Sequence, residues 1–89
     1  MTESEFRAIL KQQGYSEPVL VERAANSCLD WHSHPFEAMA LILDGDITIT
    51  NSAEKVTYSA GQTFHLVTDE QHEEYFGSKG VKYLSGRKS

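Results

Sequence analysis

The chain has 89 residues, a net charge of −5 at pH 7 and a single cysteine. This length predicts one domain over residues 1–89, which buries only about 60–65% of its unfolded surface and so has a marginal core. The acidic charge argues against a nucleic-acid partner, because a phosphate backbone requires a clustered basic surface. One cysteine excludes an internal disulfide.

The N-terminal residues and the apolar runs predict a cytoplasmic protein without membrane contact. Residues 1–5 are acidic and lack the apolar core of a signal peptide. The longest uninterrupted apolar run, residues 38–43, is far too short to span a bilayer.

Residues 2–13 are predicted to form a helix. Thr2 and Glu5 fit a capping box, and Gly14 suits the left-handed position at which helices end. Apolar residues three and four positions apart give the segment one apolar face. Since so short a helix is unstable alone, we expect it to dock on the rest of the domain.

After Pro18 the pattern changes to short strands separated by polar turns. The predicted strands cover residues 19–21, 29–34, 36–43, 47–50, 55–58, 63–67, 72–76 and 81–84. The acidic and glycine residues 44–46 predict a hairpin, and residues 77–80 predict another turn. About eight short strands at this spacing predict an all-β sandwich or barrel, and the lack of helices between them excludes parallel βαβ units.

The apolar run at residues 38–43 does not alternate with polar residues, as it would in a strand with one solvated face. One face must meet the interior, and the other either the N-terminal helix or a second subunit. From this pattern, and from the marginal core, we predict a homodimer.

Three histidines are the candidate metal ligands. His32 and His34 lie in an H-x-H pair, and a strand places both rings on the same face, because side chains alternate with period two. His72 follows 38 positions after His34, beyond a second strand-like run. Because imidazole is the commonest metal ligand near neutral pH, this pattern favours a three-nitrogen site.

The paired histidines stand within a longer motif. Asn26 is followed after five residues by His32-Ser33-His34, then by Glu37, and the motif closes at Gly45.

A second motif surrounds the third histidine. It begins at Gly61, continues through Val67 and Asp69 to His72, and ends at Phe76.

Together the two motifs resemble those of the cupins, G-x5-H-x-H-x3,4-E-x6-G and G-x5-P-x-G-x2-H-x3-N, and especially the small single-domain bacterial cupins. The resemblance covers residues 19–86. It implies a cupin jelly-roll barrel of about eight antiparallel strands, preceded by one short N-terminal helix. It also implies a metal at the barrel mouth, held by His32, His34, His72 and a glutamate.

The identity of that glutamate is open. Counting back from Gly45, its usual place is held by Ala38, and Glu37 is one residue early. In a regular strand Glu37 points away from the face that the paired histidines share, whereas a bulge near Pro35 would turn it toward them. Asn26, at the position of the first motif glycine, is a mild departure because asparagine tolerates a positive φ.

Other side chains are assigned to the pocket or to the ligand surroundings. His65 lies between two apolar residues on the opposite face from them, so it is predicted to pack or to line the pocket rather than to bind metal. The apolar pocket lining is predicted to include Phe36, Ile42, Ile47 and Phe64. Candidates for holding the second ring nitrogens of the ligands are Asp30, Glu73 and Glu74.

The predicted function is the binding of a divalent transition metal, with a small oxygenated molecule as substrate or ligand. Zinc, iron, nickel, copper and manganese all suit such a site, whose open coordination positions are those a catalytic metal requires. As an enzyme, the chain would be a metal-dependent dioxygenase or isomerase. The alternative is a non-enzymatic module that senses or binds a metal or small ligand, with a metal-free form included.

Overall fold

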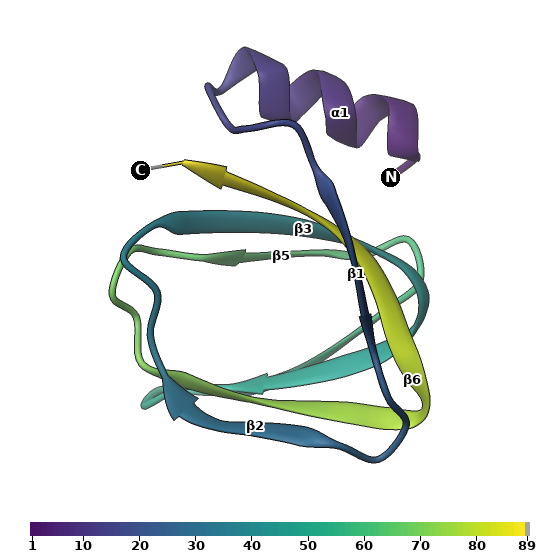
Figure 1. The fold of residues 1–89 in the computed structure, drawn as a ribbon, viewed down its shortest axis with the longest axis vertical. Helices are drawn as coiled ribbons and strands as arrows, with labels where there is room; N and C mark the ends of the chain where they lie inside the picture. The colour runs from purple at the N-terminus through teal and green to yellow at the C-terminus, as the bar shows by residue number, and fades with distance from the viewer. Residues whose placement is uncertain (89) are drawn as a thin grey trace.

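A computed structural model describes residues 1–88, which form one helix and six strands (Figure 1). The elements are α1 (Glu3–Gln12), β1 (Val19–Arg23), β2 (Cys28–His32), β3 (Glu37–Thr50), β4 (Lys55–Ser59), β5 (Thr63–Leu66) and β6 (His72–Lys88). Among residues 1–88, no helix has the length and apolar character that crossing a bilayer requires.

Two long bent strands, β3 and β6, build both layers of the molecule. The first half of β3 pairs with β5 and with the second half of β6, while its second half pairs with β4 and the first half of β6. With β1 and β2 also paired to β6, the layers have the orders β1-β6-β3-β5 and β2-β6-β3-β4. Figure 1 shows β6 running through one layer and bending into the other. All pairings are antiparallel, which confirms the predicted jelly-roll class.

The hairpin predicted at residues 44–46 and the turn predicted at residues 77–80 are both wrong. Strand β3 continues through the first and β6 through the second, and the register between them shifts on both sides of Gly45. Such a shift marks a bulge, which bends a strand without ending it. The two strands predicted on either side of each of these turns therefore form one bent strand. As a result, the eight predicted strands correspond to six strands in the structure.

The bend depends on a close approach between Gly45 and Gly80. Gly45 has a φ of 76°, and a Cβ atom built on it would lie 2.0 Å from the carbonyl oxygen of Gly80. No side chain fits at that distance, so glycine is required where the bends of the paired strands β3 and β6 meet.

Two polar residues take the left-handed conformation at motif positions that glycine usually fills. Asn26 has a φ of 57° and Asp69 a φ of 62°. Asparagine and aspartate are the residues that tolerate this region best after glycine. The sequence-based expectation for Asn26 is confirmed, and Asp69 behaves in the same way.

Helix α1 covers the outer face of the β3 layer (Figure 1). It begins at the predicted capping box, in which Thr2 and Glu5 bond to each other's backbone amides. Its apolar face is buried in a cluster that consists of Phe6, Leu10, Tyr15, Leu41 and Leu84. The outer face of the apolar run at 38–43 thus packs against the helix. This is one of the two alternatives that the sequence left open, the other being a second subunit.

The predicted homodimer remains a prediction, and the structure points to where it can be tested. Val19, Leu20, Trp31 and Tyr75 are apolar or aromatic side chains that are more than half exposed. Burial of such side chains drives most association. At high micromolar concentration we expect sedimentation equilibrium to give the mass of a dimer, and Trp31→Ser to shift it toward the monomer. A parent chain that sediments as a monomer would contradict the prediction.

Candidate metal centre

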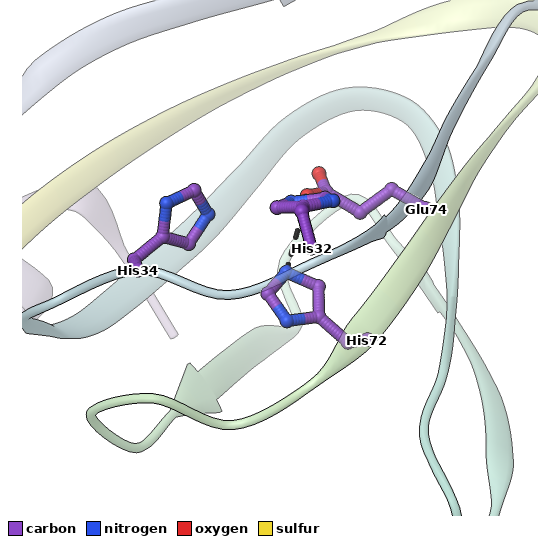
Figure 2. A group of neighbouring side chains, drawn as sticks. All are labelled: His32, His34, His72 and Glu74. Carbon is purple, nitrogen blue, oxygen red and sulfur yellow. Dashed lines mark hydrogen bonds and ion pairs between the residues drawn. The ribbon is translucent and has the colours of Figure 1, made fainter.

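Three histidines and one glutamate converge where β2 ends and β6 begins (Figure 2). His32 is the last residue of β2, and His34 lies in the loop that leads to β3. His72 opens β6 and is paired in register with His32, while Glu74 follows two positions later. Because the strand alternates, His72 and Glu74 share the inner face of the sheet.

The four side chains are close enough to bind one ion. One ligand atom from each of them lies within 4.8 Å of all the others. The ring centroids of His32 and His72 are 4.3 Å apart, and the centroid of His34 is 4.9 Å from the first and 5.4 Å from the second. Three imidazoles and a carboxylate are ligands that suit divalent transition metals, so this group can hold one.

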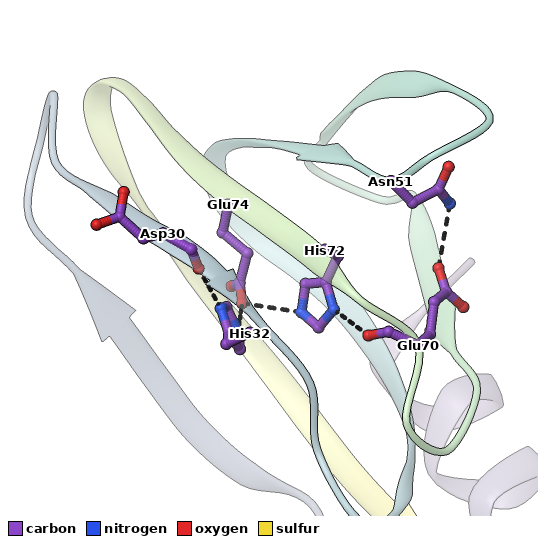
Figure 3. Close-up of polar contacts among 6 residues, drawn as sticks. All are labelled: Asp30, His32, Asn51, Glu70, His72 and Glu74. Carbon is purple, nitrogen blue, oxygen red and sulfur yellow. Dashed lines mark hydrogen bonds and ion pairs between the residues drawn. The ribbon is translucent and has the colours of Figure 1, made fainter.

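Backbone carbonyls orient two of the rings (Figure 3). His32 Nδ1 is 2.6 Å from the carbonyl oxygen of Asp30, and His72 Nδ1 is 2.9 Å from that of Glu70. A carbonyl oxygen only accepts hydrogen bonds, so both Nδ1 atoms are donors. In the neutral rings the hydrogen is then on Nδ1, and Nε2 carries a free lone pair, the state required for binding a metal.

Both of these Nε2 atoms face the Glu74 carboxylate. The distances to its Oε2 are 2.9 Å from His32 and 3.3 Å from His72. The His32 Nε2 atom is buried, yet it has no partner in hydrogen-bond geometry among the described residues. Two electron-rich atoms held this close need a proton or a cation between them, and a carboxylate that is 6% exposed needs charge compensation. The residues therefore fit a metal ion.

Burial lowers the pKa of His34, and the neighbouring His32 and His72 lower it further. A lowered pKa keeps the His34 ring neutral at physiological pH. Its lone pair is then available to a metal.

The loop beneath His72 is itself tied down. The Glu70 side chain accepts a hydrogen bond from Asn51 Nδ2 at 3.1 Å and another from the Val67 amide at 3.2 Å. These contacts fix the Glu70 backbone, whose carbonyl orients His72 (Figure 3). Of the acidic residues that the sequence offered as partners of the ring nitrogens, Asp30 contributes its backbone carbonyl, and Glu74 contributes its carboxylate, which lies against both Nε2 atoms.

Glu37, the glutamate that the sequence offered as a fourth ligand, lies on the other face of β3. Its carboxylate accepts hydrogen bonds from the Tyr15 hydroxyl, at 2.9 Å, and from His65 Nε2. The neighbouring Ala38 points into the inner core, so regular alternation holds and no bulge turns Glu37 toward the histidines. Glu37 is not part of the four-residue group.

These hydrogen bonds, that from His65 first, lower the pKa of Glu37 below its usual 4.5. The unfolded chain then takes up a proton more readily than the folded chain. The contribution of Glu37 to stability is complete above about pH 4.5 and is lost as the pH falls through the folded pKa. We expect the free energy of unfolding, measured with urea, to fall more steeply from about pH 5 to pH 3 in the parent than in Glu37→Gln. Parallel pH profiles would contradict this role.

The predicted pocket residues divide between the cavity, the core and the outer face. Phe36 and Phe64 line a cavity of about 100 Å³ beside His34 and Glu74. Ile42 and Ile47 lie in the core between the layers and do not line this cavity.

His65 also lies outside that cavity. It is exposed on β5, pairs in register with Met39 and bonds to Glu37 on the outer face. The period-two alternation of β5 separates it from Phe64 and Leu66, which are buried inside.

Sequence reasoning missed Glu74 as a member of the group. The sequence indicated Glu74 only as a hydrogen-bond partner of the ligand rings. However, the spacing His72-x-Glu74 is the same as that of the paired histidines. The alternation rule that places His32 beside His34 would have placed Glu74 beside His72.

The fold has known counterparts, although comparisons of sequence identify none. No family model and no curated protein matches the chain. Among solved structures, the DMSP lyase DddQ from Ruegeria pomeroyi DSS-3 superposes with a TM-score of 0.71 at 17% identity over 79% of this chain. The chain spans only 36% of the length of that structure.

Two shorter proteins match in the same way. KdgF from a Halomonas species gives a TM-score of 0.67 at 15% identity, covering 81% of this chain and 68% of its own. A cupin superfamily protein from Desulfitobacterium hafniense gives 0.68 at 19% identity, covering 78% and 62%. At these identities the likeness concerns the fold alone. The chain has the cupin fold, which confirms the fold that the two motifs implied.

Proposed function

We propose that this chain is a small cupin domain that binds one divalent transition metal through His32, His34, His72 and Glu74. The buried, unpartnered Nε2 of His32 beside the Glu74 carboxylate carries the proposal. When bound there, such a metal would polarise or chelate an oxygen atom of a small ligand. We further propose that the cavity beside His34 receives a small oxygenated molecule, either as ligand or as substrate.

Within this function each side chain has its own task. The Nδ1 anchors of His32 and His72 hold both rings ready, so little reorganisation accompanies metal binding. Glu74 supplies the negative charge that a divalent cation favours.

A second candidate function is binding or sensing without turnover. The small size of the cavity, about 100 Å³, favours it, because few atoms of a substrate can be enclosed. Incubation of the metal-loaded chain with a candidate molecule separates the two functions. Unchanged ligand recovered from a saturated protein indicates a binding module, and converted product indicates an enzyme.

The role of Glu74 predicts a difference between two glutamates. We expect Glu74→Gln, which keeps size and loses charge, to raise the dissociation constant for Zn²⁺ at least about 10-fold, since loss of a residue that only contacts a metal ligand already costs about 10- to 100-fold. Glu37→Gln should leave that constant unchanged, because Glu37 lies on the outer face of β3. Competition titration against a chromogenic zinc chelator measures both. Equal effects of the two substitutions, or none from Glu74→Gln, would remove Glu74 from the ligand set.

A further inference from the structure

The cavity beside the metal centre also contains two arginines. Arg23 and Arg87 line it together with His34 and Glu74. The strand register places both on the inner-facing side of their strands, and both remain exposed to solvent where they line the cavity. Arg87 pairs with Ala38 and Arg23 with Val81, whose side chains lie in the inner core, and paired residues share a face. In a chain with a net charge of −5, two guanidinium groups at one small cavity concentrate positive charge there.

Arg87 is held in place, and its hydrogen-bond donors remain available. Its guanidinium carbon lies 4.5 Å from the centroid of the Phe36 ring. Stacking on a ring face leaves the N–H groups, which lie in the guanidinium plane, free to bind an anion.

Neither arginine is neutralised by a carboxylate of the described chain. The ion pairs within residues 1–88 involve Arg7 and the histidines, not Arg23 or Arg87. Arg23 Nη1 donates a hydrogen bond to the Glu22 carbonyl oxygen, at 3.3 Å, and not to a carboxylate. Arginine donors are strongest toward carboxylate and phosphate, so both groups can still take an anion.

Neutral donors complete the cavity. Tyr83 and Ser85 line it, and burial raises the pKa of Tyr83 to about 12, so its hydroxyl stays protonated. The apolar lining includes Phe36, Phe64 and Leu66. This combination suits a ligand with one anionic end and a short apolar part.

We propose that the cavity binds a small monocarboxylate, whose carboxylate group is held by Arg23 and Arg87. This assignment names the ligand class of the proposed function. Any reaction of the ligand rests on that proposed function, whereas binding of the carboxylate by the two arginines does not. A volume of about 100 Å³, roughly that of three water molecules in the liquid, limits the enclosed part to a few atoms. The buried Glu74 carboxylate disfavours a dianion such as phosphate.

Propionate and propionamide are matched probes, because they have nearly the same size and differ in charge. We expect propionate, added to the ¹⁵N-labelled full chain, to shift the amide signals of Phe36 and Ser85 in a saturable way, and propionamide to leave them in place. Arg23→Gln/Arg87→Gln should weaken propionate binding at least about tenfold. The control Lys79→Gln/Lys82→Gln removes the same charge from exposed residues of β6 that do not line the cavity, and it should bind as the parent does.

Equal binding of both probes, an equal loss in the lysine variant, or phosphate binding as tight as propionate binding would each overturn the proposal. Arg87→Lys guards against misfolding as an explanation, because it keeps the charge and should retain part of the affinity. Elemental analysis of the same samples reports on the metal separately. Failure of the carboxylate site is therefore distinguishable from failure of the metal site.

Discussion

Elemental analysis is expected to find about one equivalent of a transition metal in the purified parent chain and none in His32→Ala/His34→Ala. The double variant removes two of four ligands that lie within 4.8 Å of one another, and the remaining pair cannot bind an ion tightly. The result would also name the metal. Metal at 100 times its dissociation constant stabilises the folded state by about 2.7 kcal/mol, so thermal unfolding of the parent should shift upward by about 10–20 °C.

His65→Ala is the matched control for that experiment. His65 is a histidine of the same domain that bonds to Glu37 on the outer face, away from the four ligands. This variant should retain the full metal content and the thermal shift. If the parent stays free of metal after anaerobic reconstitution with iron, zinc, nickel and manganese, the histidines line a plain ligand pocket and the metal proposal is wrong.

The largest effect on stability is expected from Gly45→Ala. The added Cβ would lie 2.0 Å from the Gly80 carbonyl oxygen, so the paired strands β3 and β6 must move apart at their bends. The positive φ costs about 1–2 kcal/mol and the clash about 1–3 kcal/mol more. A total of about 2–5 kcal/mol is a large share of the stability of a small domain. Urea unfolding followed by circular dichroism measures the loss.

Gly61→Ala separates the two contributions. Gly61 has a φ of 88°, similar to that of Gly45, but a Cβ atom there would meet nothing within 4 Å. Its substitution should cost only about 1–2 kcal/mol, the strain of the left-handed conformation. Equal costs at both positions would show that the contact between the two long strands does not limit the side chain at 45.

Local patterns predicted the helix and the strand segments well, and pairing between distant strands explains what they missed. The capping box of Thr2 and Glu5 depends on residues three positions apart, so it is readable in the sequence. Turn residues such as those around Gly45 are ambiguous, because a tight two-residue hairpin and a glycine bulge both use a positive φ. Here the pairing of β3 along β6 decides for the bulge, and β6 lies more than 20 residues further along the chain.

The candidate site likewise contains features that local patterns predict and one that depends on pairing between distant strands. The sequence correctly predicted that His32, His34 and His72 come together, since the first two share a strand-like face and the third lies in the second motif. It left open whether Glu37 or no carboxylate completes the ligand set. The structure places Glu74 there, because His32 and His72 are partners across two neighbouring strands. That register is set by tertiary pairing and is not visible in either strand alone.

The position of β6 in the sheet has a consequence for how the chain folds. This last strand is the partner of β1, β2 and β3, so most of the pairing in both layers joins residues far apart in sequence. Folds dominated by such contacts fold slowly, typically in milliseconds to seconds. During synthesis neither layer can assemble before residues 72–88 leave the ribosome, and until then the apolar inner face of β3 is exposed to aggregation. A chain truncated before β6 should therefore accumulate as insoluble protein rather than as a smaller folded domain.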